Sequence, residues 1–329
     1  MPMLLNKKDI NYYFGENIEV TYLDPIGEEY LVLKPKKKIS LVDWVRDNQE
    51  LLEQAITYKK GVLLRGFTIS SISQFNKTVR IVSPSLLDYM YCSTPRTRLG
   101  GQIYTATEYP KNKTIPLHNE NSYSLSWPNK IFFFSVITTS QGGETPIASS
   151  VNVYNKLDVN IKEKFDKLKV MYVRNYYPDI DLPWQEVFQT EDPKQVEEYC
   201  RKQHITCDWA KGTAVLKTKQ VCQASVSHLR TGEKAWFNQA HLFHITALDI
   251  QTKGVMLDKF GVEGVPRNTF YGNGEEISFE VLEHIREVYN AAKITFSWQN
   301  GDVMMLDNVL TAHSRNPFQG QRKVVVAMS

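Results

Sequence analysis

The chain has 329 residues, 42% hydrophobic and 23% charged, which is the composition of an ordinary globular protein able to bury a large core. These values exclude a disordered, a collagen-like or a disulfide-scaffold protein. The 39 basic and 36 acidic residues leave a net charge of +3, too small to indicate electrostatic binding of nucleic acid. Length alone allows one large domain or two ordinary ones.

The cysteines indicate a reducing environment. The chain has four cysteines, Cys92, Cys200, Cys207 and Cys222, and they contain no CxxC pair. The last three are expected to be core thiols. The first residues lack the apolar segment of a signal peptide, and no apolar run approaches the roughly 20 residues that a membrane helix needs. We therefore expect a cytoplasmic protein with no membrane partner.

The first hundred residues predict two helices separated by a short strand. Ser40 is a typical N-cap, and apolar residues recur at helical spacing from Leu41 as far as Gly61, which is expected to end the helix. The strand Val62–Leu64 follows, and then a second helix from about Ser71 to Val82. We expect these helices to buttress a β-rich body.

From Tyr104 onward, short β-rich runs alternate with turn residues. The expected strands are 102–107, 131–138, 212–216, 235–237, 294–297, 303–306 and 323–328, and the expected helical insertions are 160–168, 193–203 and 277–292. No glycine-rich nucleotide-binding motif lies between a strand and a helix.

This pattern predicts a mainly β fold with helical insertions, namely a double-stranded β-helix (jelly roll) with an N-terminal helical buttress. Because no linker interrupts the sequence, we expect a single domain over residues 1–329. Within it, residues 1–100 would form the α/β buttress and residues 101–329 the jelly-roll core.

Two segments carry candidate metal ligands. Seven histidines are present, and His118 is followed two residues later by Glu120. In an extended segment these two side chains point to the same face, which supplies half of the two-histidine, one-carboxylate triad of non-heme Fe(II) oxygenases. Near the other end of the chain His313 follows a predicted strand, and Arg322 precedes the last one. In a jelly roll these distant segments can face one cavity, where an arginine fork suits a carboxylate.

Several motifs together resemble one known family. HNExSYS with WP, GGETPIA, WFNQ and the H-x-R-x-PF-x-G-x-R ending are similar to the Fe(II)- and 2-oxoglutarate-dependent dioxygenases of the taurine dioxygenase (TauD/TfdA) and clavaminate synthase-like superfamily. The branch most similar in appearance is that of the syringomycin-type amino-acid hydroxylases of nonribosomal-peptide pathways. The matching segments begin at GVLLRGF (residues 61–67) and continue to the C-terminal end, so the resemblance covers most of the chain.

The resemblance implies a role for individual residues. His118, Glu120 and His313 would hold Fe(II), while Arg322 and Thr145 would bind the distal carboxylate of 2-oxoglutarate, which is consumed together with O2. Many members carry a second arginine where this chain has Val326. Halogenases of the superfamily replace the ligand carboxylate with a small residue; because Glu120 is retained here, hydroxylation is favoured. Desaturation or ring formation would use the same site.

The residues that contact the substrate are harder to assign. The resemblance places the WFNQ stretch near the active site, which makes Asn238, Gln239 and His241 candidates. Asn121, Ser122 and Tyr123 are candidates because they directly follow the metal motif, and Arg315 is a further candidate between His313 and Arg322. For the three residues after Glu120, hydrogen bonding within the loop is an equally good interpretation. His241 and His244 have a spacing that could bind zinc on a helix, although the aromatic residues around them favour a cavity wall. Arg96 and Arg98 could bind a substrate carboxylate or pair with acidic residues.

We therefore predict a 2-oxoglutarate-dependent oxygenase of specialised metabolism. Its partner would be a small amino-acid-like substrate, either free or tethered to a peptidyl carrier protein. An alternative is a non-catalytic jelly-roll module that binds a small ligand or a carrier protein. A zinc hydrolase is the third interpretation, but the HExxH helix that would support it is absent from the sequence.

Overall fold

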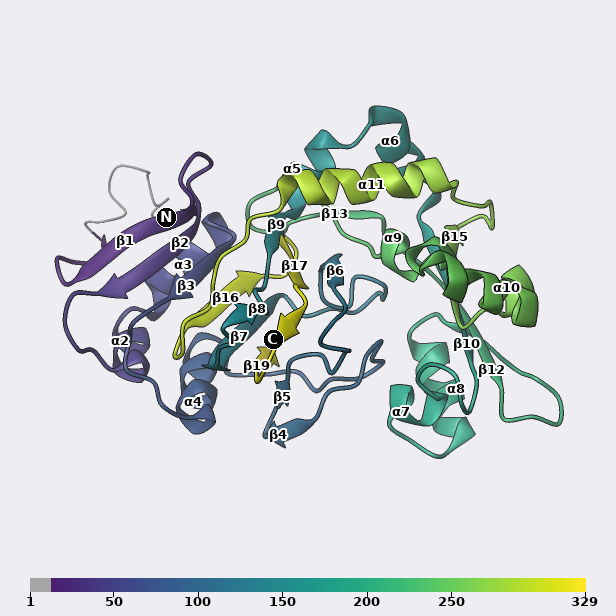
Figure 1. Cartoon of the computed structure of the whole chain (residues 1–329), viewed down its shortest axis with the longest axis horizontal. Helices are drawn as coiled ribbons and strands as arrows, with labels where there is room; N and C mark the ends of the chain where they lie inside the picture. Colours follow the sequence, from purple (N-terminus) through teal and green to yellow (C-terminus); the bar gives the residue numbers. More distant parts are fainter. Residues whose placement is uncertain (1–12) are drawn as a thin grey trace.

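The computed structural model describes residues 13–329, and its largest element is an eight-stranded sheet (Figure 1). Every neighbouring pair in it is antiparallel except β2 and β3, which are parallel. In spatial order the strands are β1 (Ile18–Asp24), β2 (Glu29–Pro35), β3 (Gly61–Leu64), β16 (Val303–Asp307), β7 (Lys130–Ile137), β19 (Lys323–Met328), β5 (Ile103–Thr105) and β4 (Arg98–Gly100).

A smaller antiparallel sheet packs against one face of this large sheet. It consists of β6 (Ile115–His118), β17 (Thr311–Arg315) and β9 (Ile147–Ser149), in that order, and β8 (Gln141–Gly142) pairs with β18 (Phe318–Gln319) beside it. One hydrophobic cluster joins Leu117 and Ala312 of the small sheet to Phe133, Met304 and Val326 of the large sheet. The expectation of a mainly β, double-stranded β-helix fold is therefore confirmed.

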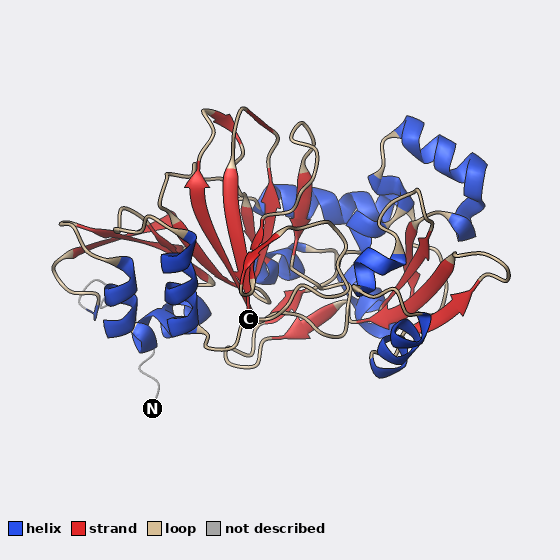
Figure 2. Ribbon diagram, turned by 90° about the horizontal axis from the view of Figure 1, so that it is seen from below, coloured by secondary structure: helices blue, strands red, loops and turns tan. Residues whose placement is uncertain are grey.

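Helices cover the other face of the large sheet. They are α2 (Leu41–Asp47), α3 (Gln49–Tyr58) and α4 (Ile72–Val82), drawn on the left in Figure 2. Along β3 the side chains of Val62 and Leu64 belong to the cluster under these helices, while Leu63 belongs to the cluster between the sheets. The helical buttress is confirmed, and β1 to β3 of the same segment extend the large sheet itself.

The predicted helix starts are confirmed, but one predicted helix end is wrong. The hydroxyls of Ser40 and Ser71 accept hydrogen bonds from the backbone N–H groups three residues later, as N-caps do. The helix expected to run as far as Gly61 is divided at Asn48 and ends at Tyr58. Lys60, with φ of 65°, makes the turn that follows.

Gly61 instead begins β3, where its missing side chain permits a close approach of two strands. A Cβ atom at this position would lie 2.5 Å from Leu306 Cδ2 and 3.1 Å from the Met305 carbonyl oxygen, both in β16. The glycine therefore serves strand packing and not helix termination.

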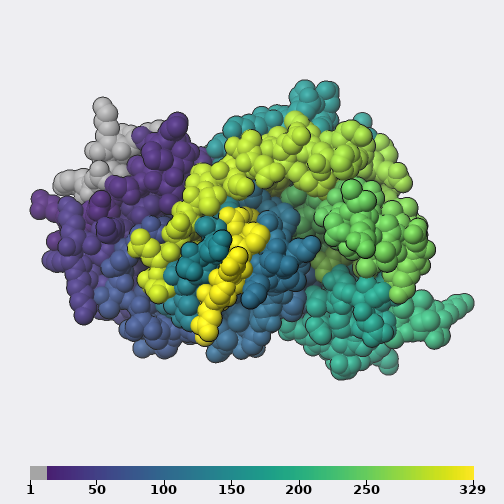
Figure 3. All heavy atoms as spheres, in the orientation of Figure 1, coloured from purple at the N-terminus to yellow at the C-terminus, as the bar shows by residue number. Residues whose placement is uncertain are grey.

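The segment between β9 and β16 forms a second lobe, on the right in Figures 1 and 2. Its sheet has the order β11 (Thr206–Trp209), β12 (Leu216–Cys222), β10 (Val170–Tyr176) and β15 (Arg267–Tyr271). The remaining elements are α5 (Ser150–Lys156), α6 (Val159–Leu168), α7 (Trp184–Phe188), α8 (Pro193–Lys202), β13 (Ser225–Ser227), β14 (Lys234–Trp236), α9 (Ala240–Phe243), the 3₁₀ helix η1 (Ile245–Ala247), α10 (Ile250–Gly264) and α11 (Phe279–Ala292). Figure 3 shows a hollow between this lobe and the body of the molecule.

Most of the helices and strands predicted from the sequence are present in the structure, but two predicted strands are wrong. The expected strand at 212–216 is a turn that ends where β12 begins. In β12 the inward positions include Thr218 and Gln220, so polar side chains hide its period-2 pattern. The expected strand at 294–297 is reduced to one isolated bridge between Ile294 and Ile147. None of the described helices is both long and apolar enough to cross a membrane.

The contact at Gly61 gives a stability prediction. Gly61→Ala inserts a methyl group against β16, so we expect the free energy of unfolding in urea to fall by about 1–3 kcal/mol. The matched control is Gly254→Ala in α10, where a Cβ atom meets nothing within 4 Å and helix propensity favours alanine. Equal stability of Gly61→Ala and the parent chain would contradict the role assigned to Gly61.

Candidate active site

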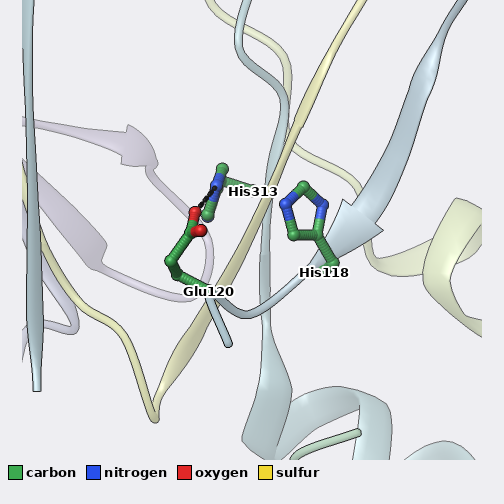
Figure 4. A group of neighbouring side chains, drawn as sticks. All are labelled: His118, Glu120 and His313. Atoms are coloured by element: carbon green, nitrogen blue, oxygen red, sulfur yellow. Dashed lines mark ion pairs between the residues drawn. The ribbon is translucent and has the colours of Figure 1, made fainter. Parts of the chain in front are cut away.

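Two histidines from distant parts of the chain lie side by side on adjacent strands of the small sheet. His118 is the last residue of β6, and the antiparallel register of β6 with β17 makes His313 its direct partner. The centroids of the two imidazole rings lie 4.5 Å apart. Glu120 lies two residues beyond β6, and one ligand atom from each of the three side chains lies within 4.8 Å of the others (Figure 4). The three residues expected to converge are therefore brought together.

Asn308, in the turn between β16 and β17, holds the backbone of Glu120 in place. Its side-chain oxygen accepts a hydrogen bond from the Glu120 N–H (2.7 Å), and its amide nitrogen donates to the Glu120 carbonyl (3.0 Å). The neighbouring Asn119 side chain donates to the Asn308 carbonyl (2.6 Å). These buried bonds fix the loop after β6 to the hairpin that carries His313.

Burial keeps both imidazoles neutral. It lowers the pKa of His118 and lowers that of His313 well below the usual value. The His118 Nδ1 atom lies 2.8 Å from the Pro116 carbonyl oxygen, which can only accept, so Nδ1 carries the proton and Nε2 is left with a free lone pair. His313 Nε2 lies 3.7 Å from a Glu120 carboxylate oxygen.

This donor set fits a divalent metal ion. Neutral imidazoles and a carboxylate are the ligands that non-heme Fe(II) takes, and three of them on one side of an ion leave positions for other ligands. His313 Nε2 faces the Glu120 carboxylate and makes no hydrogen bond among the described residues, so it is available as a ligand; His313 Nδ1 is buried without a partner there.

A cavity beside the two histidines contains the predicted carboxylate anchor. It is lined by Arg96, Ala106, Thr107, Ile115, His118, Phe133, Thr145, His313, Ser314, Arg315, Arg322, Val324 and Val326. His118 and His313 thus share one space with Arg322 and Thr145, and Val326 presents an apolar wall where many members of the family carry a second arginine.

Arg322 is oriented by two contacts. Its Nε donates to the Gly143 carbonyl (2.8 Å), and one terminal nitrogen donates to the Thr145 hydroxyl (3.3 Å). Thr145 also accepts a bond from Trp298 Nε1 (2.9 Å), which fixes its hydroxyl. Burial lowers the pKa of Arg322 to about 10, so the group remains charged at neutral pH.

The polar residues after Glu120 are bonded to the protein itself. Asn121 has a φ of 54°, and its side-chain oxygen lies 3.2 Å from the Tyr123 hydroxyl, which donates to the Tyr91 carbonyl (2.8 Å). The Ser122 hydroxyl donates to the Asn119 carbonyl. None of the three lines the cavity described above. Their assignment to the substrate stays a prediction, and the loop bonds are what the structure contains.

The WFNQ stretch supports the same loop from the other side. Asn238 donates to the Ala224 carbonyl, and Gln239 donates to the Asn119 carbonyl. His241 donates through Nε2 to the carbonyl of Leu117, the residue before His118 (3.0 Å). Arg315 alone among the predicted substrate residues lines the cavity, and its terminal nitrogens donate to the carbonyls of Tyr109, Pro110 and Lys113.

Sequence reasoning missed one residue that shapes the site, Asn308, and left the role of another, Arg96, open. Asn308 carried no motif signal beyond its place in a turn after a predicted strand. Arg96 was left undecided between an acidic partner and a substrate carboxylate; it forms an ion pair with Glu120, with 2.8 Å between nitrogen and oxygen. Arg98, which carried the same two interpretations, pairs with Asp88 on the surface and its side chain is 56% exposed.

Comparison with known proteins defines the class of this fold and site. The profile of the family described as "Taurine catabolism dioxygenase TauD, TfdA family" matches residues 19–328. The chain belongs to this family, and it is an Fe(II)- and 2-oxoglutarate-dependent dioxygenase.

Individual relatives agree with this membership. The chain is 40% identical to the dapdiamide synthesis protein DdaC of Enterobacter agglomerans over 84% of each chain. It is 26% identical to a clavaminate synthase-like protein of Arabidopsis thaliana over 86% of each chain. Among solved structures, PvcB, described as an Fe, alpha-ketoglutarate dependent oxygenase from an isonitrile synthetic pathway, superposes with a TM-score of 0.57 at 14% identity, covering 100% of this chain and 94% of PvcB. That likeness shows the fold.

Removing the Asn308 side chain tests how the loop is held. Asn308→Ala deletes both bonds to the Glu120 backbone, so we expect Mn(II) affinity, measured by calorimetry, to fall about 10- to 100-fold. Asn160→Ala on the exposed surface of α6 is the control and should bind Mn(II) as the parent chain does. Unchanged affinity in Asn308→Ala would show that Glu120 is positioned by other contacts.

His241 gives a prediction for the pH dependence of stability. Burial lowers the pKa of His241 to about 3, whereas an unfolded histidine titrates near about 6.5. Below about pH 6.5 this histidine is protonated in the unfolded state but stays neutral in the folded state. The free energy of unfolding therefore falls as the pH falls. Between about pH 7 and pH 5 the parent chain should lose about 1–2 kcal/mol more unfolding free energy than His241→Gln. Equal losses in urea titrations would contradict a neutral buried His241.

Proposed function

We propose that the chain hydroxylates an unactivated C–H bond of an amino acid or an amino-acid-derived compound in the synthesis of a specialised product. The observation that carries this proposal is the 40% identity, over 84% of the chain, to a protein named for dapdiamide synthesis. Retention of the carboxylate ligand at Glu120 supports oxygen transfer as the reaction.

In this proposal the site residues have distinct roles. His118, Glu120 and His313 hold Fe(II), and Arg322 with Thr145 binds the distal carboxylate of 2-oxoglutarate. When bound, iron and 2-oxoglutarate supply the oxidising chemistry, in which O2 is consumed and succinate and CO2 are released. The protein itself places the co-substrate and the C–H bond and keeps water away.

The walls of the cavity suit that task. Phe133 packs its ring against His313 with 5.2 Å between centroids, and Val324 and Val326 face the same space from β19. Apolar groups here leave little to hydrogen-bond water, so a bound reactant would be shielded from solvent.

The charge of the cavity supports an anionic substrate. Arg96, Arg315 and Arg322 line it, Glu120 is the carboxylate paired with Arg96, and the two ligand histidines are neutral. Positive charge therefore exceeds negative charge before any ion binds, and a divalent metal increases the excess. A dicarboxylate co-substrate together with an amino-acid carboxylate would reduce it.

The proposed substrate is either a free small molecule or an aminoacyl group on a peptidyl carrier protein. We further propose that the protein acts in the cytoplasm and that residues 1–329 fold as one domain. The continuous sheet from β1 to β4 supports the last point, because strands of the N-terminal hundred residues flank the strands of the core.

The proposed ligands are tested by single substitutions. His118→Ala, Glu120→Ala and His313→Ala should each reduce succinate formation from 2-oxoglutarate at least about 100-fold, because each removes one metal ligand. Folding is checked by far-UV circular dichroism. His204→Asn on the surface, at a φ of 55° that asparagine tolerates, is the matched control. Full turnover by any one of the three variants would remove that residue from the proposed set.

The substrate class is tested by a screen. Succinate formation is measured with Fe(II), O2 and 2-oxoglutarate against free amino acids, N-acyl amino acids and carrier-bound aminoacyl thioesters. We expect at least one member to raise succinate formation above the level without substrate and to gain one oxygen atom by mass. A product that has lost two hydrogens would contradict hydroxylation, and no response to any member would contradict the substrate class.

A further inference from the structure

Three arginines line the cavity, and their contacts differ. Both terminal nitrogens of Arg315 donate hydrogen bonds to the backbone carbonyls of Tyr109, Pro110 and Lys113, so Arg315 stabilises that loop. Arg322 is held by Gly143 and Thr145 at the proposed 2-oxoglutarate end. Arg96 alone forms an ion pair with a side chain of the proposed metal site, through one terminal nitrogen and Glu120.

The rest of the Arg96 guanidinium is poorly satisfied although its side chain is only 4% exposed. The nitrogen that contacts Glu120 also lies 3.4 Å from the Thr107 hydroxyl. The other terminal nitrogen has only the Met328 sulfur, a weak acceptor, at 3.8 Å, and Nε is buried without any partner among the described residues. Buried N–H groups of a cation without acceptors are costly, so an incoming acceptor would be bound strongly.

The guanidinium is also held in a fixed plane. Its carbon lies 4.4 Å from the centroid of the buried Tyr89 ring, and Glu120 holds one edge. A planar donor fixed beside the reacting centre is suited to a carboxylate, because two parallel N–H groups match its two oxygens.

We propose that Arg96 binds the carboxylate of the amino-acid-like substrate and so positions the substrate beside the metal site. The inference rests on the proposed function. Arg322 and the metal site already provide counter-charges for the two carboxylates of 2-oxoglutarate, which leaves Arg96 for the substrate. Arg96 lies in the loop before β4 and lines the same cavity as Val326 of β19.

The test compares two ligands in matched variants. The ligands are the free amino acid with the highest kcat/KM in the screen and its C-terminal primary amide, which lacks the negative charge. The parent chain should prefer the acid about 10- to 100-fold in kcat/KM, and Arg96→Gln should abolish that preference. Arg96→Lys, which keeps the charge but not the fork, should show an intermediate ratio and serves if Arg96→Gln does not fold.

Arg98→Gln is the control, since Arg98 is two residues away and exposed, paired with Asp88 at 3.3 Å. It should keep the parent preference. Calorimetric titration of each variant with Mn(II) and then with 2-oxoglutarate provides readouts independent of turnover, and both affinities should change less than the acid-to-amide ratio.

An unchanged ratio in Arg96→Gln would overturn the inference while leaving the proposed function intact. Weaker Mn(II) binding or weaker 2-oxoglutarate binding with the ratio unchanged would also overturn it, because Arg96 would then hold only Glu120 or the co-substrate. If the parent chain turns over a carrier-bound aminoacyl thioester but no free amino acid, this inference fails while the proposed function stands, because the thioester has no free carboxylate. If no member of the screen is turned over, both fail.

Discussion

The antiparallel pairing of β6 with β17 is the constraint on which the site depends. It places His118 directly opposite His313, although the two lie far apart in the sequence. A shift by one residue would turn one imidazole to the other face of the small sheet, because side chains alternate along a strand. The apolar contacts of Leu117 and Ala312 with the large sheet oppose such a shift, and Asn308 then sets the loop that brings Glu120 to the two rings. Ordinary strand packing therefore determines the ligand geometry.

The second theme of the structure is the balance of buried charge. The site keeps its histidines neutral by burial and retains Glu120 beside Arg96, with Arg322 farther along the same cavity. Buried cations without matching carboxylates are unfavourable in an empty cavity and become favourable when anions bind. This arrangement costs folding stability and leaves a site prepared for a metal ion with dicarboxylate and carboxylate ligands.

Much of the fold and site could be predicted because its signals are local. The caps at Ser40 and Ser71 and the spacing of His118 and Glu120 each lie within a few residues, and the resemblance linked the last pair to His313. What could not be predicted depends on contacts between distant segments. The close approach at Gly61 arises from β16, and the ion pair of Arg96 joins two loops without any repeating pattern. Strand β12 was not predicted because its inward-facing side chains include polar residues, which hide the alternation typical of a strand.

The central claim is that His118, Glu120 and His313 bind one metal ion beside the cavity that holds 2-oxoglutarate. The most direct measurement is a crystal structure of the protein with Mn(II) and 2-oxoglutarate, grown without O2. The account predicts one metal ion bound by these three side chains, with the distal carboxylate of 2-oxoglutarate against Arg322 and Thr145. A metal ion bound by any other set of residues, or 2-oxoglutarate bound away from Arg322, would contradict it.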